Sequence, residues 1–184
     1  MSEQPGELLI GREELAAKVA ELGETIARDY AGRVPVLVGV LKGAAMFLMD
    51  LIRATPIPLE IDFMAVSSYG AATESSGVVR ILKDLDAPIV DRHVILVEDI
   101  IDSGMTMAYV LDMLRRRNPA SLRIAALLVK ERAAAAGLNA HYRGFTIPER
   151  FVVGYGLDFQ ERYRNLPHIA ALDNSEHTAT VALI

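Results

Sequence analysis

Three carboxylates and a glycine-containing turn lie within one short stretch of the chain, directly after an apolar run. The run covers residues 94–97, the adjacent acids are Glu98 and Asp99, and the turn at residues 102–106 reads Asp-Ser-Gly-Met-Thr. Because such a run predicts a buried strand of a parallel sheet, the acids and the turn are expected at its carboxyl end. Helix N-termini bind anions, and carboxylates bind divalent cations or sugar hydroxyls. The stretch therefore indicates a phosphorylated sugar bound with Mg²⁺.

The stretch Val94–Thr106 resembles the signature of type I phosphoribosyltransferases: a hydrophobic strand, two acids, two apolar residues, then Asp-(Ser/Thr)-Gly-x-Thr. The alternative is a strand that ends in solvated acids before a capped helix. That alternative does not explain why an acid, two hydroxyls and a glycine gather in one turn. The resemblance implies an α/β fold, with a mainly parallel sheet flanked by helices and a small hood subdomain formed from the termini.

The turn is the expected phosphate site. Gly104 allows close backbone approach, Ser103 and Thr106 offer hydroxyl donors, and the helix dipole favours a dianion. The resemblance implies that the turn holds the 5-phosphate of a ribose. Several relatives have a basic residue where this chain has Met105, so backbone amides would carry more of the binding here.

Two adjacent acids would point to opposite faces of a regular strand. Glu98 and Asp99 could therefore serve one ligand only if the strand is already ending. The resemblance implies that it is, and that the pair meets the ribose hydroxyls and Mg²⁺. It also implies that Asp158 lies near a second Mg²⁺ and the base. Mg²⁺ is thus the expected cofactor, with Glu98, Asp99 and Asp158 as its expected ligands.

Asp102 is the expected catalytic residue. In hypoxanthine-type phosphoribosyltransferases the matching aspartate lies beside N7 of the purine, which becomes nucleophilic at N9 as the N7 proton leaves. A positioned carboxylate contributes roughly 10²–10⁴ in rate by such proton transfer. The alternative is an N-cap aspartate for the helix that follows, and the two roles are compatible.

Three further residues are implied to select the base. Lys130 follows a dry run and matches a lysine that donates to O6 of a 6-oxopurine. An ammonium has only donors, so it would disfavour a 6-amino group. Phe151 is implied to stack on the purine, and the backbone of Val152 to read its edge. The alternatives are a solvated strand end for Lys130 and an ordinary core position for Phe151.

The remaining site residues concern the diphosphate and a loop. Leu41-Lys42-Gly43 resembles the family's pyrophosphate loop, which often contains a non-proline cis peptide. Arg164 supplies a fork suited to pyrophosphate oxygens. Ser68 and Tyr69 begin a polar loop that in the family closes over the reaction centre and excludes water. A disordered surface loop would have the same composition.

The elements that would position these residues alternate between strand and helix. Helices are expected at 12–30, 44–54 and 105–117, and strands at 34–41, 58–67, 78–82, 94–97, 122–129 and 151–155. In such folds ligands bind at the carboxyl ends of the strands, where Lys42, Glu98 and Lys130 fall. We expect one domain over 1–184, with a core at about 34–165. The N-terminal helix and the C-terminal segment would form the hood.

Composition narrows the classes of protein. The chain has 184 residues, 52% hydrophobic and 23% charged, which suits one globular domain. It has no cysteine, which excludes disulfides and thiolate metal sites. The net charge of −5 argues against a nucleic-acid binder with a broad basic face. No apolar run approaches the ~20 residues that a membrane span needs, and the start of the chain does not resemble a signal peptide. We expect a cytoplasmic protein.

The resemblance spans about Leu41 to Arg164, with the motifs in the expected order. It implies purine salvage: transfer of a phosphoribosyl group from 5-phospho-α-D-ribosyl 1-diphosphate to hypoxanthine or guanine, giving IMP or GMP and pyrophosphate. A homodimer or homotetramer is implied, with no nucleic-acid or membrane partner. Two alternatives stay open. One is an enzyme that prefers xanthine, and the other is a non-enzymatic regulator that keeps the sugar-diphosphate site but binds RNA or DNA.

Overall fold

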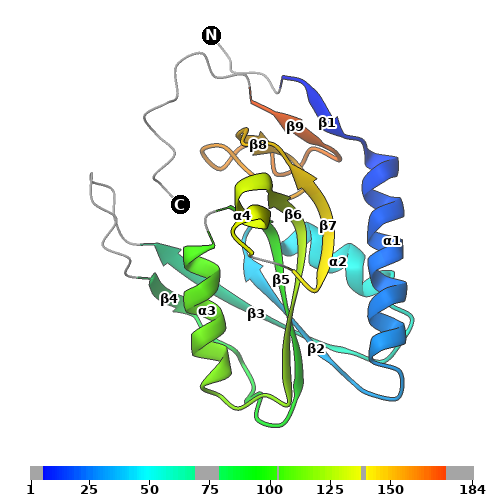
Figure 1. The fold of residues 1–184 in the computed structure, drawn as a ribbon, viewed down its shortest axis with the longest axis vertical. Helices are drawn as coiled ribbons and strands as arrows, with labels where there is room; N and C mark the ends of the chain where they lie inside the picture. The colour runs from blue at the N-terminus through cyan, green and yellow to red at the C-terminus, as the bar shows by residue number, and fades with distance from the viewer. Residues whose placement is uncertain (1–5, 69–78, 103, 138–139, 173–184) are drawn as a thin grey trace.

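The main sheet has six strands in the order β4-β3-β2-β5-β6-β7 (Figure 1). The computed structural model describes residues 6–68, 79–102, 104–137 and 140–172. The six strands are β2 (Val36–Leu41), β3 (Glu60–Ser68), β4 (Val79–Lys83), β5 (His93–Ile101), β6 (Ser121–Lys130) and β7 (Tyr142–Ile147). All neighbours are parallel except β4, which runs antiparallel to β3. The chain passes from β2 to β3 on one side and then to β5 on the other. The crevice between the carboxyl ends of β2 and β5 is therefore the expected ligand position.

Helices cover both faces of this sheet, as a parallel sheet requires. They are α1 (Arg12–Asp29), α2 (Ala45–Arg53), α3 (Met105–Arg115) and the short α4 (Glu131–Ala135). Buried side chains of α1 and α2 pack with Leu37, Ile95 and Leu127 in one core cluster. The next residue along two of these strands, Val38 and Leu96, belongs to a second cluster with α3. None of the helices in these ranges has the length and apolar character that crossing a bilayer requires.

A second, three-stranded antiparallel sheet lies past the carboxyl ends of β5, β6 and β7, at the top of Figure 1. Its order is β1-β9-β8, with β1 (Leu8–Ile10), β9 (Ile169–Ala171) and β8 (Val152–Val153). This small sheet joins segments from near both ends of the described chain, as expected for the hood. However, α1 packs against α2 and β7 rather than in the hood. The N-terminal contribution to the small sheet is β1, which the sequence analysis missed.

The other differences from the expected elements have local causes. β5 continues to Ile101, past the two acids, because it stays in register with β6 as far as the pair Ile101 and Val129. The strand expected at 151–155 shortens to β8, because Gly154 (φ 103°) and Tyr155 (φ 50°) turn the backbone. Ser68 is the last residue of β3, whereas Tyr69 and most of the polar loop lie outside the described residues.

Candidate active site

The two acids of β5 lie on opposite faces of the sheet, because the strand continues beyond them. The expectation that the strand has ended by Glu98 is therefore wrong. Asp99 faces the loop after β2: a Cβ atom added at Gly43 would lie 1.7 Å from its Oδ2. Glu98 is only 9% exposed. The structure thus separates the two carboxyl groups, and places only Asp99 against the expected pyrophosphate loop.

Both acids resist ionisation in the absence of a counter-charge. Burial raises the pKa of Glu98 well above its usual range, and the neighbouring charge of Asp99 adds to this. Burial also raises the pKa of Asp99 to about 6, although backbone hydrogen bonds and the charge of Arg164 oppose the shift. A cation or a set of hydroxyl donors would stabilise the ionised forms.

The pyrophosphate loop is held between two segments that are distant in the sequence. Its Leu41–Lys42 peptide is cis, a bond that the sequence by itself left undecided. On the side away from Asp99, a Cβ added at Gly156 would lie 2.1 Å from the Gly43 carbonyl oxygen. A side chain at either glycine would displace its neighbour, so the absence of one allows the close contact.

Lys42 and Arg164, the two expected pyrophosphate cations, are brought together by one acid. Lys42 Nζ lies 3.0 Å from Glu161 Oε1, and Arg164 Nη2 lies 3.3 Å from Glu161 Oε2. Arg164 also lies 2.7 Å from Asp158 and donates to the Gly156 carbonyl at 2.8 Å. Hydrogen bonding to Lys42 is the main reason that the pKa of Glu161 is lowered. Sequence reasoning missed Glu161, which lies 119 residues from its partner.

The three acids expected to bind metal do not form a ready-made set of ligands. Within the ranges that the structure describes, no three His, Cys, Asp or Glu side chains gather closely enough to hold an ion. Asp158 is engaged by Arg164 instead. Asp99, with its raised pKa and its position against the pyrophosphate loop, is the carboxylate whose chemistry fits a hard cation.

Asp102 and Lys130 meet at the carboxyl ends of β5 and β6. Asp102 Oδ2 lies 3.0 Å from Lys130 Nζ, and the Lys130 side chain is only 10% exposed. The other oxygen, Oδ1, accepts a hydrogen bond from Arg132 of α4. Gly104 is the N-cap residue of α3 and no side chain caps it, so the N-cap alternative for Asp102 is wrong.

Arg132 and Glu149 complete this cluster, and sequence reasoning missed both. The Arg132 backbone N–H donates to Glu149 Oε1 at 2.9 Å, and its Nε lies 3.1 Å from Oε2. Burial by itself would raise the pKa of Asp102, but hydrogen bonds and charges from Arg132 and Lys130 outweigh it, and the pKa is lowered. The signal in the sequence was a second cation two positions after Lys130.

The expected phosphate turn opens a helix of 11 residues, α3. Gly104 has φ 74° and ψ −1°, a left-handed conformation that suits glycine. Among the residues that the structure describes, no side chain caps this end of α3, so its first N–H groups suit an anion. Thr106 lies in this first turn. Ser103 and the side chain of Met105 lie outside what the structure describes.

The two expected base-reading residues near the hood are in different surroundings. Phe151 is partly buried and meets Phe159 edge to face, with ring centroids 5.7 Å apart. Its carbonyl accepts from Leu172 N–H at 3.0 Å, on the β9 side of β8. Because successive residues of a strand point their backbone groups to opposite sides, the N–H and C=O of Val152 point away from β9. β8 is the last strand of its sheet among the described residues, so these groups have no strand partner there.

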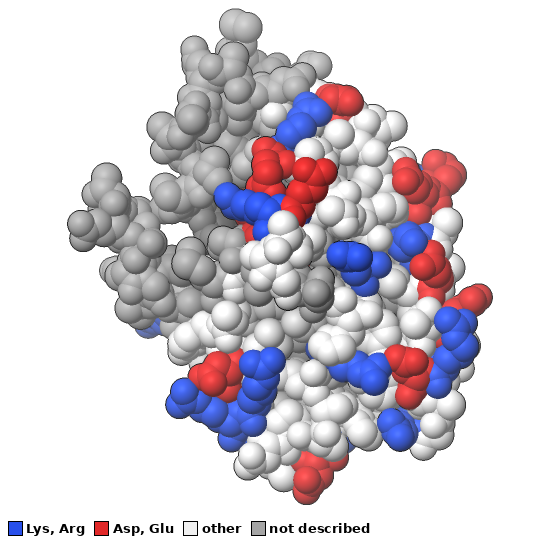
Figure 2. Space-filling model, in the orientation of Figure 1, with Lys and Arg blue, Asp and Glu red and all other residues white. Residues whose placement is uncertain are grey.

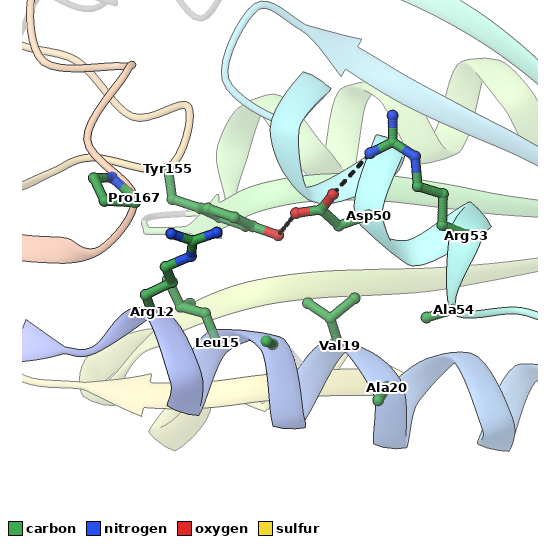
Figure 3. Close-up of a pocket in the computed structure, with 10 residues that line it drawn as sticks. Arg12, Leu15, Val19, Ala20, Asp50, Arg53, Ala54, Tyr155 and Pro167 are labelled. Carbon is green, nitrogen blue, oxygen red and sulfur yellow. Dashed lines mark hydrogen bonds and ion pairs between the residues drawn. The ribbon is translucent and has the colours of Figure 1, made fainter.

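A separate pocket of about 660 Å³ lies between α1 and α2 (Figure 3). It contains none of the expected site residues. Tyr155 donates its hydroxyl to Asp50 Oδ2 at 2.6 Å, and Arg53 lies 3.0 Å from Oδ1 of the same acid. Because Tyr155 precedes Gly156, this contact ties α2 to the segment that backs the pyrophosphate loop.

Charged side chains of both signs alternate over the face shown in Figure 2. Lys and Arg of the described residues do not form a broad basic surface on that face.

Residues 10–160 match the family model described as "Phosphoribosyl transferase domain". The chain is 51% identical over 178 residues to a hypoxanthine-guanine phosphoribosyltransferase of Mycobacterium tuberculosis, covering 92% of this chain and 88% of that protein. It is 48% identical to one of Bacillus subtilis, covering 90% and 92% of the two chains. A crystal structure of a hypoxanthine phosphoribosyltransferase from Staphylococcus aureus superposes with a TM-score of 0.87 at 45% identity, covering 92% of each chain.

Proposed function

The chain belongs to the phosphoribosyltransferase family, and we propose that it acts in purine salvage, with hypoxanthine and guanine as acceptor bases. The phosphoribosyl donor is 5-phospho-α-D-ribosyl 1-diphosphate. The observation that carries this proposal is the pairing of Asp102 with Lys130 at 3.0 Å. The pair stands beside the start of α3, so a proton acceptor, a hydrogen-bond donor for a carbonyl oxygen and the proposed phosphate site share one edge of the sheet.

In the proposed reaction, N9 of the base attacks C1 of the ribose as the bond from C1 to the diphosphate oxygen breaks. The turn at 102–106 holds the 5-phosphate through backbone N–H groups. Lys42 and Arg164 face the leaving diphosphate. When the diphosphate binds, its oxygens replace the Glu161 carboxylate as the partner of both cations. Mg²⁺, when bound, supplies further neutralisation of the diphosphate. Asp99 is its proposed ligand, whereas Glu98 points to the other face of β5 and is given no contact with this substrate.

Base selection is proposed to depend on three contacts. Lys130 donates to O6 of the purine while Asp102 accepts the proton from N7. Phe151 packs against the ring, and the open backbone edge at Val152 offers one donor and one acceptor. Lys130 suits any 6-oxopurine, so this set by itself does not distinguish hypoxanthine, guanine and xanthine. The names of the relatives favour the first two.

A spectrophotometric assay with hypoxanthine, guanine, xanthine and adenine in turn tests the proposal. We expect turnover with hypoxanthine and guanine and none with adenine. Turnover with xanthine alone would support an enzyme that prefers xanthine. Binding of the sugar diphosphate without turnover of any base would support a regulator instead. We further propose a homodimer or homotetramer, which sedimentation of the purified protein would test.

A further inference from the structure

Both oxygens of Asp102 are held, each by a different cation. Oδ2 faces Lys130 Nζ at 3.0 Å, and Oδ1 accepts from Nη2 of Arg132. Two contacts on separate oxygens fix the plane of the carboxylate, whereas one contact would leave it free to rotate. The Lys130 side chain is 10% exposed and that of Arg132 is 56% exposed, so the two cations approach from the interior and from solvent.

Arg132 is itself anchored. Glu149, in the connection between β7 and β8, accepts from the Arg132 backbone N–H at 2.9 Å and lies 3.1 Å from its Nε. These contacts leave Nη2 directed at Asp102. The chain of contacts therefore runs from Glu149 through Arg132 to the Asp102 carboxylate, and it joins the β7–β8 connection to the end of β5.

The two cations cannot have the same task during the proposed reaction. Lys130 must share its ammonium with O6 of the purine when the base binds, which weakens its hold on Asp102. The other partner of Arg132 is Glu149, which belongs to the protein and stays in place when the base binds. The charged groups that lower the pKa of Asp102 are Lys130 and Arg132, and Glu149 acts on it only through Arg132. The acids Glu98 and Asp99 come before Asp102 in the chain, on β5. An adjacent cation favours the ionised carboxylate, which is the form that accepts a proton.

We propose that Arg132, anchored by Glu149, is a positioning residue for the catalytic base: it orients the Asp102 carboxylate and keeps it ionised while Lys130 turns to the purine. This inference rests on the proposed function, because it takes Asp102 as the proton acceptor. It concerns a residue that lies outside the phosphate turn, the acids of β5 and the pyrophosphate loop.

The test is Arg132→Gln in the full chain, with Arg116→Gln as the matched control. Arg116 pairs with Asp112 on an exposed face of α3, so the control removes the same charge and a comparable ion pair away from the site. The ionisation of Asp102 is followed by carboxyl ¹³C NMR titration, and kcat/KM for hypoxanthine is followed as a function of pH.

We expect Arg132→Gln to raise the pKa of Asp102 and to move the acidic limb of kcat/KM to higher pH in the same direction. At pH values on the acidic limb, kcat/KM for hypoxanthine should fall several-fold relative to the control. KM for the sugar diphosphate should stay within about twofold of the control value. Arg132→Lys should keep most of the wild-type behaviour, because it keeps the positive charge. Glu149→Gln should raise the pKa of Asp102 by a smaller amount than Arg132→Gln does.

An unchanged Asp102 titration and an unchanged acidic limb in Arg132→Gln would overturn the inference. A fall in rate that is equal at every pH, with an unchanged Asp102 titration, would overturn the claim that Arg132 keeps the carboxylate ionised. Asp102→Asn separates this failure from failure of the proposed function. If Asp102→Asn keeps full turnover, Asp102 is not the base. If it loses turnover while Arg132→Gln changes nothing, only the role of Arg132 is wrong.

Discussion

Two carboxyl groups three positions apart, Asp99 and Asp102, are shifted in opposite directions by their surroundings. Burial raises the pKa of Asp99 to about 6, whereas Arg132 and Lys130 outweigh burial and lower that of Asp102. At neutral pH Asp102 is therefore fully ionised and able to accept a proton. Asp99 gains most from a bound cation. The same residue type is thus suited to two different tasks by the groups that surround it.

Removing the proposed base should lower turnover without weakening binding of the sugar diphosphate. Asp102→Asn retains the shape of the side chain but cannot accept the N7 proton. We expect kcat to fall by about 10²–10⁴ and KM for the diphosphate substrate to change by less than about twofold. Steady-state kinetics with each substrate varied in turn measure both. Turnover equal to that of the wild type would remove Asp102 from the catalytic role.

Lys130→Ala should affect the base more than the sugar. The change removes the donor proposed for O6 but leaves Arg132 on Asp102 and leaves the phosphate turn intact. KM for hypoxanthine and guanine should therefore rise about tenfold or more, with a smaller change for the diphosphate. Initial rates at saturating concentrations of the second substrate provide the comparison. Equal increases for both substrates would contradict a base-reading role.

Asp99→Asn should stabilise the protein in the absence of a divalent cation at high pH only. The folded-state pKa of Asp99 is raised from 3.8 to about 6. Its neutral form is thus favoured on folding, and the associated stability is complete below about pH 4 and is lost as pH rises through about 6. Asparagine carries no charge, so the variant should gain roughly 1–3 kcal/mol at about pH 8.

Urea unfolding of Asp99→Asn and wild type, each with a chelator present, measures that difference at both ends of the pH range. The two free energies of unfolding should approach each other in acid. A gain of equal size in acid and in base would show that burial of the Asp99 charge is not its cause.

At the scale of elements, the pyrophosphate loop depends on the segment after β8. Gly156 has φ 105° and packs its backbone on the Gly43 carbonyl. Gly156→Ala would place a methyl group 2.1 Å from that oxygen, so the loop must shift. We expect KM for the diphosphate substrate to rise about tenfold or more, because displacements of about 1 Å have large effects on binding and catalysis.

Gly32→Ala is the control for backbone strain in that experiment. Gly32 also has a positive φ of 74°, but no described atom lies within 4 Å of an added Cβ there. It should lose stability without a change in KM. If both variants raise KM equally, contact with Gly43 is not the reason for the effect of Gly156→Ala.

The main strands and helices could be predicted because each combines an apolar pattern with a clear end. α1 and α3 began at the expected residues and ended within two of the expected positions. β1 and β9 have three residues each, too few to show a period, and they are recognisable only from their pairing in the small sheet, where β9 lies between β1 and β8. The contact of Arg132 with Glu149 could not be predicted either, because it needs β6 and β7 to lie side by side first.

At the scale of the whole molecule, the motifs anticipated from the sequence meet at one end of the fold. Lys42 and Asp102 follow β2 and β5, and Lys130 is the last residue of β6; these three strands are adjacent in the sheet. The order of the motifs in the sequence predicted that these residues lie at the carboxyl ends of the strands, but it did not predict the side chains that pair with them. Glu161 and Glu149 were missed because acids in irregular segments show no pattern that distinguishes them from surface charges.

The position of Gly156 also affects how the protein can be divided into fragments. The six-stranded sheet is complete at Ile147, yet the surface that presses on Gly43 and the partners of Lys42 come after it. Val152, Leu157 and Ile169 are also part of the main core cluster. A fragment that stops where the sheet stops would retain every strand of the scaffold but lack one wall of the diphosphate site. The smallest working piece of this chain must therefore extend beyond Arg164, and split or circularly permuted versions should keep that segment joined to its neighbours.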